Sequence, residues 1–107
     1  MISTLLIGGK GTIGAGLRTY LPQLDSDYRV VSADLAGAPD AATDSSAHRE
    51  FVELDASVDD AKLRSALEGC DLVVYLARKD PLSDMNAMTD RVFNAIMDVC
   101  PNAVVIG

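Results

Sequence analysis

The sequence predicts a single doubly wound α/β domain, in which five parallel strands are covered by helices on both faces. Short hydrophobic runs alternate with longer segments of helical periodicity, which is the pattern of consecutive βαβ units. The chain has 107 residues, of which 49% are hydrophobic. A chain of this length and composition forms one globular domain, spanning residues 1–107, rather than two.

Five short runs rich in Val, Ile and Leu are predicted to be strands. Several are continuously apolar, as parallel strands buried on both faces are. Right-handed crossovers and the usual doubly wound connectivity place them in the order 3-2-1-4-5. The runs are Ile2 to Ile7, Arg29 to Ala33, Glu50 to Leu54, Leu72 to Leu76 and Ala103 to Ile106.

A first helix is predicted after the first run, because five apolar side chains recur there at spacings of three and four. They are expected to share one buried face, and the helix is expected to end near Pro22. These side chains are Ile13, Leu17, Tyr20, Leu21 and Leu24.

Two further helices follow the third and fourth runs. The stretch 59–67 opens with acidic residues and is followed by Gly69, where a helix stop is favoured. Another helix is expected from about Ser83, capped by Ser83 or Asp84, and Pro101 prevents its continuation. Its apolar stripe consists of Met85, Met88, Val92, Phe93, Ile96 and Val99.

A glycine-rich segment lies directly between the first strand and the first helix, and it satisfies both GxxGxxG and GxGxxG. Glycines there allow a tight turn, leave room for a pyrophosphate and let the helix pack closely on the strand. The helix N-terminus adds free N–H groups and a partial positive charge. The segment is therefore predicted to bind a dinucleotide through Gly8, Gly9, Lys10, Gly11, Thr12, Ile13 and Gly14.

The acidic residue that accompanies this motif is Asp34, which closes the second strand twenty residues after Gly14. A carboxylate at this place binds the ribose 2′-hydroxyl, so Asp34 and the following Leu35 are predicted cofactor contacts. Lys10 is a competing signal, because a cation in the loop suits the 2′-phosphate of NADP. Since Asp34 would repel that phosphate while Lys10 can point to solvent, NAD is favoured over NADP.

With these glycines and Asp34, two more segments make the chain resemble the extended short-chain dehydrogenase/reductase family, which includes sugar epimerases, dehydratases and uronate dehydrogenases. They are the Leu54–Asp55 pair after the third strand and the segment 71–77, DLVVYLA, which is similar to the family's DxVxxLA segment. The resemblance covers the whole chain and implies a Rossmann-type fold. It also implies that Asp55, with Ala56, contacts the adenine, although a cap or turn residue fits Asp55 equally well.

The same resemblance implies that the chain at Leu76 and Ala77 passes along the cofactor. Arg78 departs from the pattern, because a small residue usually follows there, and this arginine either crowds the cofactor or binds its phosphates. No catalytic asparagine is assigned to Asn86 or Asn94, because the helix from Ser83 lacks the family's asparagine-centred pattern.

Catalysis in the family depends on a helical YxxxK pair beyond the fifth strand, so the resemblance implies that residues 1–107 are the cofactor-binding part of a longer enzyme. Tyr75 and Lys79 match YxxxK by spacing. Tyr75 lies in a predicted strand, however, and four strand residues separate two side chains by about 13 Å. Tyr75 is therefore predicted to be a core residue, and no catalytic residue is assigned.

Other function classes are excluded by composition. The net charge of −7 argues against nucleic acid, and the sequence has no signal peptide or membrane span, which predicts a cytoplasmic protein. Cys70 and Cys100 are expected to be reduced, buried thiols. His48, in or beside a predicted surface loop at 36–48, lacks partners with metal-ligand spacing, so no metal site is predicted.

Two functions remain open at this stage. The first is the NAD-binding domain of a sugar epimerase, dehydratase or dehydrogenase, whose sugar or nucleotide-sugar substrate would be bound by segments after Gly107. The second is an NAD(P)-binding module that senses redox state, or serves as a scaffold, without catalysis. An open sheet edge at the fifth strand favours association with another copy or with a further segment.

Overall fold

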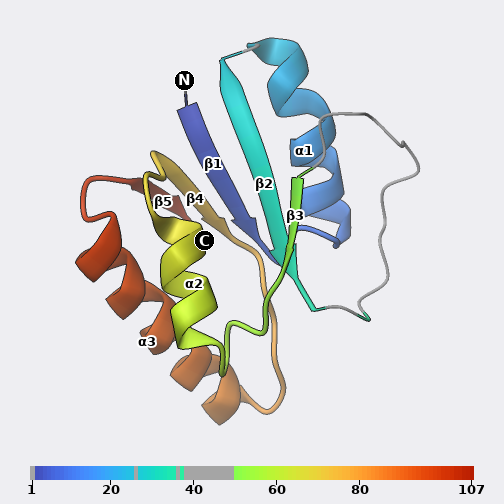
Figure 1. The fold of residues 1–107 in the computed structure, drawn as a ribbon. Coiled ribbons are helices and arrows are strands. Elements are labelled where there is room, and N and C mark those ends of the chain that lie inside the picture. Colours follow the sequence, from blue (N-terminus) through green and yellow to red (C-terminus); the bar gives the residue numbers. More distant parts are fainter. Residues whose placement is uncertain (1, 26, 36, 38–49) are drawn as a thin grey trace.

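The computed structural model of this chain describes residues 2–25, 27–35, 37 and 50–107. These residues form one five-stranded sheet and three helices (Figure 1). In chain order the elements are β1 (Ile2–Ile7), α1 (Thr12–Leu24), β2 (Tyr28–Asp34), β3 (Glu50–Glu53), α2 (Asp60–Leu67), β4 (Leu72–Tyr75), α3 (Leu82–Val99) and β5 (Val104–Ile106).

The sheet is parallel throughout and has the strand order β3-β2-β1-β4-β5, which confirms the predicted topology. β1 is central: Ile2 lies opposite Tyr28 of β2, and Thr4 lies opposite Leu72 of β4. The order of the strands reverses between β1 and β4. In open α/β sheets a ligand binds beyond the carboxyl ends of the strands at such a point.

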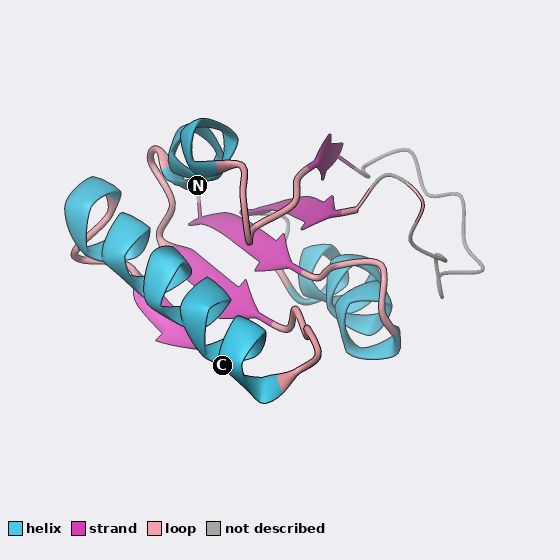
Figure 2. Ribbon diagram, turned by 90° about the horizontal axis from the view of Figure 1, so that it is seen from below, coloured by secondary structure: helices cyan, strands magenta, loops and turns pink. Residues whose placement is uncertain are grey.

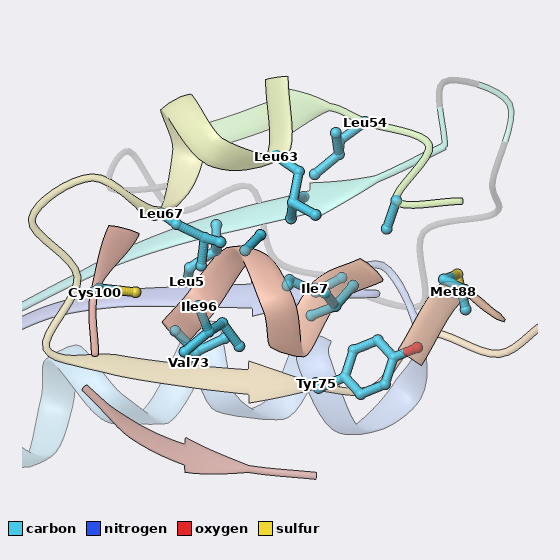
Figure 3. Close-up of a cluster of buried hydrophobic side chains, with 14 residues drawn as sticks. Leu5, Ile7, Leu54, Leu63, Leu67, Val73, Tyr75, Met88, Ile96 and Cys100 are labelled. Carbon is cyan, nitrogen blue, oxygen red and sulfur yellow. The ribbon is translucent and has the colours of Figure 1, made fainter. Parts of the chain in front are cut away.

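Helices cover both faces of the sheet, as Figure 2 shows. The larger core lies between the sheet and the pair α2 and α3, and its side chains converge in Figure 3. This core accounts for the apolar stripe predicted for α3, five of whose six residues are buried or half-buried within it. Its buried residues are Leu5, Ile7, Ala33, Leu54, Ala56, Leu63, Leu67, Val73, Tyr75, Met88, Val92, Ala95, Ile96 and Cys100.

The apolar face predicted for α1 is wrong in part. Three of its five side chains are exposed, with Ile13 at 67%, Tyr20 at 64% and Leu24 at 79%, and only Leu17 and Leu21 pack against the sheet. The buried positions of this helix are instead Gly14, Ala15 and Arg18. The reason is steric: a Cβ at Gly14 would lie 2.6 Å from Gly9 Cα, so the helix turns its Gly14 side toward the loop that precedes it.

The edge strands also differ from the expectation of continuous burial. β1 is buried from Thr4 to Ile7, but in the edge strand β5 Val104 is 62% and Ile106 55% exposed. β3, at the other edge, has one half-buried residue among exposed ones. Strands at the edge of a sheet have a neighbour on one side only, so continuous hydrophobicity does not guarantee burial there.

The start of α3 is one residue earlier than predicted, and its cap is different. Neither Ser83 nor Asp84 caps the helix; Pro81 occupies the N-cap, and no side chain bonds to the free N–H groups. The Pro81 carbonyl accepts hydrogen bonds from the N–H groups of Asp84 and Met85. For α2, the predicted stop is confirmed, because Gly69 adopts a left-handed φ of +74°.

Both cysteines were expected to be buried thiols. Cys100 is buried and Cys70 half-buried, and desolvation raises the pKa of the Cys70 thiol to about 11. Apart from Gly37, the predicted loop at 36–48, including His48, lies outside the described residues. In the described part of the chain, no helix has the length and apolarity to cross a membrane, and no three potential metal ligands cluster.

Candidate dinucleotide site

The site begins with a sharp turn at the end of β1. Gly8 has a φ of +89°, in the left-handed region that favours glycine. Its N–H donates to the Ala33 carbonyl at 2.8 Å, which ties the turn to β2. A Cβ at Gly8 would lie 2.7 Å from the Ala77 nitrogen. Only glycine therefore lets the end of β1 approach the segment that follows β4.

The next glycines bring the start of α1 onto the sheet. A Cβ at Gly9 would lie 2.6 Å from Ser32 Oγ, and one at Gly14 would lie 2.6 Å from Gly9 Cα. Distances this short are incompatible with a side chain. The loop therefore packs directly on β2, and the helix packs directly on the loop, as predicted for close helix–strand packing.

Gly11 differs from the other loop glycines, because the protein itself leaves room there. The nearest atom to an added Cβ would be the Gly8 carbonyl oxygen at 3.7 Å, an ordinary contact. Gly11 is exposed, is the N-cap of α1, and has the extended backbone angles φ −67° and ψ 175°. Since none of the described residues requires a glycine here, the space above Gly11 is available to a ligand.

The N-terminus of α1 is suited to an anion. The N–H groups of Thr12, Ile13 and Gly14 belong to the first turn, where no intrahelical acceptor exists. No acidic side chain lies in that turn, so the positive end of the helix dipole is not neutralised by a carboxylate of the helix itself. This combination binds phosphate in many α/β proteins.

A cleft of about 1100 Å³ opens in front of this helix end, at the carboxyl edge of β1, β4 and β5. Eight of the predicted site residues line it: Gly8, Gly11, Thr12, Ile13, Gly14, Leu76, Ala77 and Arg78. The other six line no part of it. They lie farther along the same edge, in the loop or after β2 and β3, and comprise Gly9, Lys10, Asp34, Leu35, Asp55 and Ala56.

Asp34 ends β2 and organises the loop beside it. Its Oδ2 accepts the Lys10 N–H at 2.9 Å and its Oδ1 accepts the Leu35 N–H at 2.8 Å. The expectation that Lys10 points to solvent is wrong: its ammonium lies 4.4 Å from the centre of the Phe51 ring, a cation–π distance. Phe51 belongs to β3 and was not foreseen, because this contact joins the loop after β1 to an edge strand far away in the sequence.

Asp55 follows β3 and is held by its own turn. Its Oδ1 accepts hydrogen bonds from the Ser57 hydroxyl at 2.5 Å and the Ser57 N–H at 3.0 Å. These bonds, the side-chain one first, hold the pKa of the Asp55 carboxyl below its usual value. Ala56 is 6% exposed and belongs to the core, so its side chain is unavailable to a ligand in this structure.

Tyr75 and Lys79 do not form a pair. The Tyr75 hydroxyl lies 3.1 Å from Thr89 Oγ1, and its ring packs edge-on against Phe93 with centroids 6.0 Å apart. The Lys79 ammonium instead donates to Ser57 Oγ at 2.9 Å. With Tyr75 7% exposed, the prediction of a core role is confirmed.

Arg78 is exposed at the cleft, and its guanidinium forms no ion pair with any described residue. The cleft also contains residues that were not predicted as cofactor contacts. Met85 and Phe93 were predicted as core, but they line the cleft, because the first half of α3 runs beside the carboxyl end of β4. The ten lining residues that were not predicted to contact the cofactor are Tyr75, Lys79, Asp80, Leu82, Met85, Thr89, Phe93, Val105, Ile106 and Gly107.

No protein-family model and no curated protein matches the sequence, but solved structures share its fold. A Rossmann-fold NAD(P)-binding family protein from Shigella flexneri aligns with 98% of this chain at 17% identity and a TM-score of 0.79. Uronate dehydrogenase from Agrobacterium tumefaciens, in complex with NAD, aligns with 100% of it at 18% identity and a TM-score of 0.72.

A third similar structure is dTDP-glucose 4,6-dehydratase from Bacillus anthracis in complex with NAD, which covers 98% of this chain at 18% identity with a TM-score of 0.79. The likeness confirms the predicted Rossmann-type fold. The chain spans 50%, 40% and 36% of the length of these three proteins, respectively.

Proposed function

We propose that this chain binds NAD at the carboxyl edge of its sheet and is the cofactor-binding part of a sugar epimerase, dehydratase or dehydrogenase. The observation that carries the proposal is the glycine loop, in which Gly8, Gly9 and Gly14 are required by the fold while Gly11 is not. A glycine that the protein does not need for its own packing is explained by close approach of a ligand.

The residues present fit a dinucleotide. The free N–H groups at the start of α1 suit its pyrophosphate, and the cleft beyond them has room and apolar surface for the nicotinamide half. Arg78 adds a positive charge at the cleft that no described carboxylate pairs with, and this charge is suited to phosphate. When bound, NAD would supply hydride transfer, while the residues of this chain would hold and orient it.

For the adenosine half we propose Asp34 and Asp55 as contacts, the first to the ribose and the second to the adenine amine. Asp34 favours NAD because a carboxylate at the ribose repels the 2′-phosphate of NADP. Lys10 lies near this position through its contact with Asp34, but its ammonium is placed over Phe51. That placement supports NAD as the preferred cofactor.

The second candidate function is dinucleotide binding without catalysis, as in a redox-sensing or scaffold module. Tyr75 is hydrogen-bonded to Thr89 and Lys79 to Ser57, so the two do not form a catalytic pair. This separation favours the non-catalytic function for these 107 residues taken alone. A Ser or Thr followed by a helical YxxxK in a continuation of the chain would decide for the enzyme. We propose sugar or nucleotide-sugar substrates only for the enzyme, and not for the non-catalytic module.

The test compares Gly11→Val with Gly16→Ala by calorimetric titration with NAD. Valine suits the extended backbone of Gly11, so the variant should fold, but its side chain would occupy the pyrophosphate position and lower NAD affinity by more than about a hundredfold, or ~2.7 kcal/mol. Gly16 lies in the same helix with no atom within 4 Å of an added Cβ, and its variant should bind as the wild type does. Unchanged affinity in folded Gly11→Val would make the loop a structural turn only.

A further inference from the structure

A chain of side-chain hydrogen bonds joins two loops at the carboxyl edge of the sheet. Lys79, in the loop between β4 and α3, donates to Ser57 Oγ at 2.9 Å. Ser57, in the loop between β3 and α2, donates in turn to Asp55 Oδ1 at 2.5 Å. The two loops are separated by the whole of α2 and β4 in sequence. Lys79 therefore connects the cleft side of the site to its adenine side.

The two oxygens of the Asp55 carboxylate have different environments. Oδ1 accepts both hydrogen bonds from Ser57, whereas Oδ2 accepts none from the described residues. The backbone is fixed as well, because the Asp55 N–H donates to Asp59 Oδ2 and the Asp55 carbonyl accepts the N–H of Val58. One oxygen is thus used to orient the group, and the other remains an acceptor for a ligand.

The charge of Lys79 acts on Asp55 through the serine. The ammonium contacts no carboxylate of the described residues within ion-pair distance, and its one hydrogen-bond partner is Ser57 Oγ. Because the ammonium is a donor only, it fixes the Ser57 oxygen as its acceptor and leaves the hydroxyl proton directed at Asp55. Donors linked in series strengthen one another. The positive charge of Lys79 also contributes to the lowered pKa of Asp55, after the two hydrogen bonds from Ser57.

We propose that Lys79 is a positioning residue for adenine recognition: acting through Ser57, it holds Asp55 so that Oδ2 accepts a hydrogen bond from the exocyclic amine of the cofactor. The inference rests on the proposed binding of NAD. It assigns to Lys79 a role distinct from a catalytic one, and it makes the loop after β4 a determinant of base specificity at the far side of the site.

The first test uses two ligands that differ at one group, NAD and nicotinamide hypoxanthine dinucleotide, in which an oxygen replaces the adenine amine. Lys79→Gln should weaken NAD binding by about tenfold, the loss of one charge-assisted hydrogen bond, and should change binding of the hypoxanthine dinucleotide by less than about twofold. Lys79→Arg, which keeps the donor and the charge, should recover most of the affinity. Lys62→Gln, an exposed lysine on α2, is the matched control and should bind both ligands as the wild type does.

A double-mutant cycle tests whether Lys79 acts through Asp55. Asp55→Asn keeps an acceptor oxygen for Ser57 but replaces the second oxygen with a donor. If the inference is correct, Lys79→Gln has no further effect on NAD affinity in the Asp55→Asn background, because coupled groups are non-additive. An equal loss for both dinucleotides, or additive losses in the cycle, would overturn it.

A third measurement needs no ligand. Titration of the Asp55 carboxyl by carbon-detected NMR should show a higher pKa in Lys79→Gln than in the wild type and no change in Lys62→Gln. A wild-type chain that binds no NAD would overturn the proposed function and the adenine role with it. NAD affinity that is unchanged in Lys79→Gln, or an Asp55 pKa that is the same in Lys79→Gln and the wild type, would overturn the positioning role alone.

Discussion

The two faces of the sheet bury different kinds of side chain. The face under α2 and α3 is apolar, and Leu63, Leu67 and Val92 are completely buried there. The α1 face has a smaller apolar cluster beside two polar side chains, Thr4 and Ser32, each 1% exposed. By strand alternation both point toward α1, and neither hydroxyl has a hydrogen-bond partner among the described residues.

The difference follows from the position of the glycine loop. Ser32 lies directly beneath Gly9, where an added Cβ would be 2.6 Å from its hydroxyl, so a larger side chain at Ser32 would push the loop away from the sheet. A buried hydroxyl without a partner costs about 1–3 kcal/mol. The α1 face therefore gives up stability to bring the loop close to β2, while the opposite face supplies most of the apolar burial.

Substitution in the core under α2 and α3 should reduce stability most. Leu63→Ala removes a completely buried side chain between α2 and the sheet, and such substitutions cost about 2–5 kcal/mol. Leu17→Ala, on half-buried Leu17 of α1, should cost about 1 kcal/mol. Chemical unfolding of both variants measures the difference. Equal losses would show that the two faces contribute alike and would contradict the comparison.

On the α1 face, the charge of Asp34 beside the glycine loop can be tested separately from the packing. Asp34→Asn keeps one acceptor for the Lys10 and Leu35 N–H groups but removes the charge that disfavours a 2′-phosphate. We expect the preference for NAD over NADP to narrow by about ten- to a hundredfold, the value of a charged hydrogen bond of about 1.5–3 kcal/mol. Calorimetry with both cofactors gives the ratio, which is insensitive to any general loosening of the loop. If the wild type bound NADP more tightly than NAD, Lys10 rather than Asp34 would determine the cofactor preference.

The fold could be predicted because its signals are local and agree with one another. Alternation of strand-like and helix-like periodicity set the element order, and the connectivity rules for parallel sheets then set the strand order. The buried face of α1 could not be predicted from periodicity, because exposed Ile13, Tyr20 and Leu24 recur at the same helical spacing that buried residues show. The close contact between Gly14 and Gly9 decides which side meets the sheet, and that contact is tertiary.

The candidate site was predicted where a single segment encodes it, as in the glycine loop. Contacts between segments far apart in the sequence were not predictable: Lys10 over Phe51 and Lys79 on Ser57 each join segments that only the folded sheet brings together. A spacing rule was misleading for the same reason. Tyr75 and Lys79 match YxxxK in sequence, yet Tyr75 ends β4 and Lys79 lies in the following loop, whereas a helix would place residues i and i+4 together.

Tyr75, on the α2/α3 face, should tolerate the loss of its hydroxyl with a modest cost in stability. Tyr75→Phe removes the hydrogen bond to half-exposed Thr89, which water can replace in part, so the free energy of unfolding should fall by about 0.5–1.5 kcal/mol. With uronates and nucleotide sugars, we expect no NADH production by the chain before or after the substitution, because the Lys79 ammonium is bonded to Ser57 and not placed to lower the pKa of the phenol. Chemical unfolding and NADH absorbance measure the two outcomes. Wild-type turnover that disappears in Tyr75→Phe would make Tyr75 and Lys79 a catalytic pair and would give the apolar face a chemical role as well as a structural one.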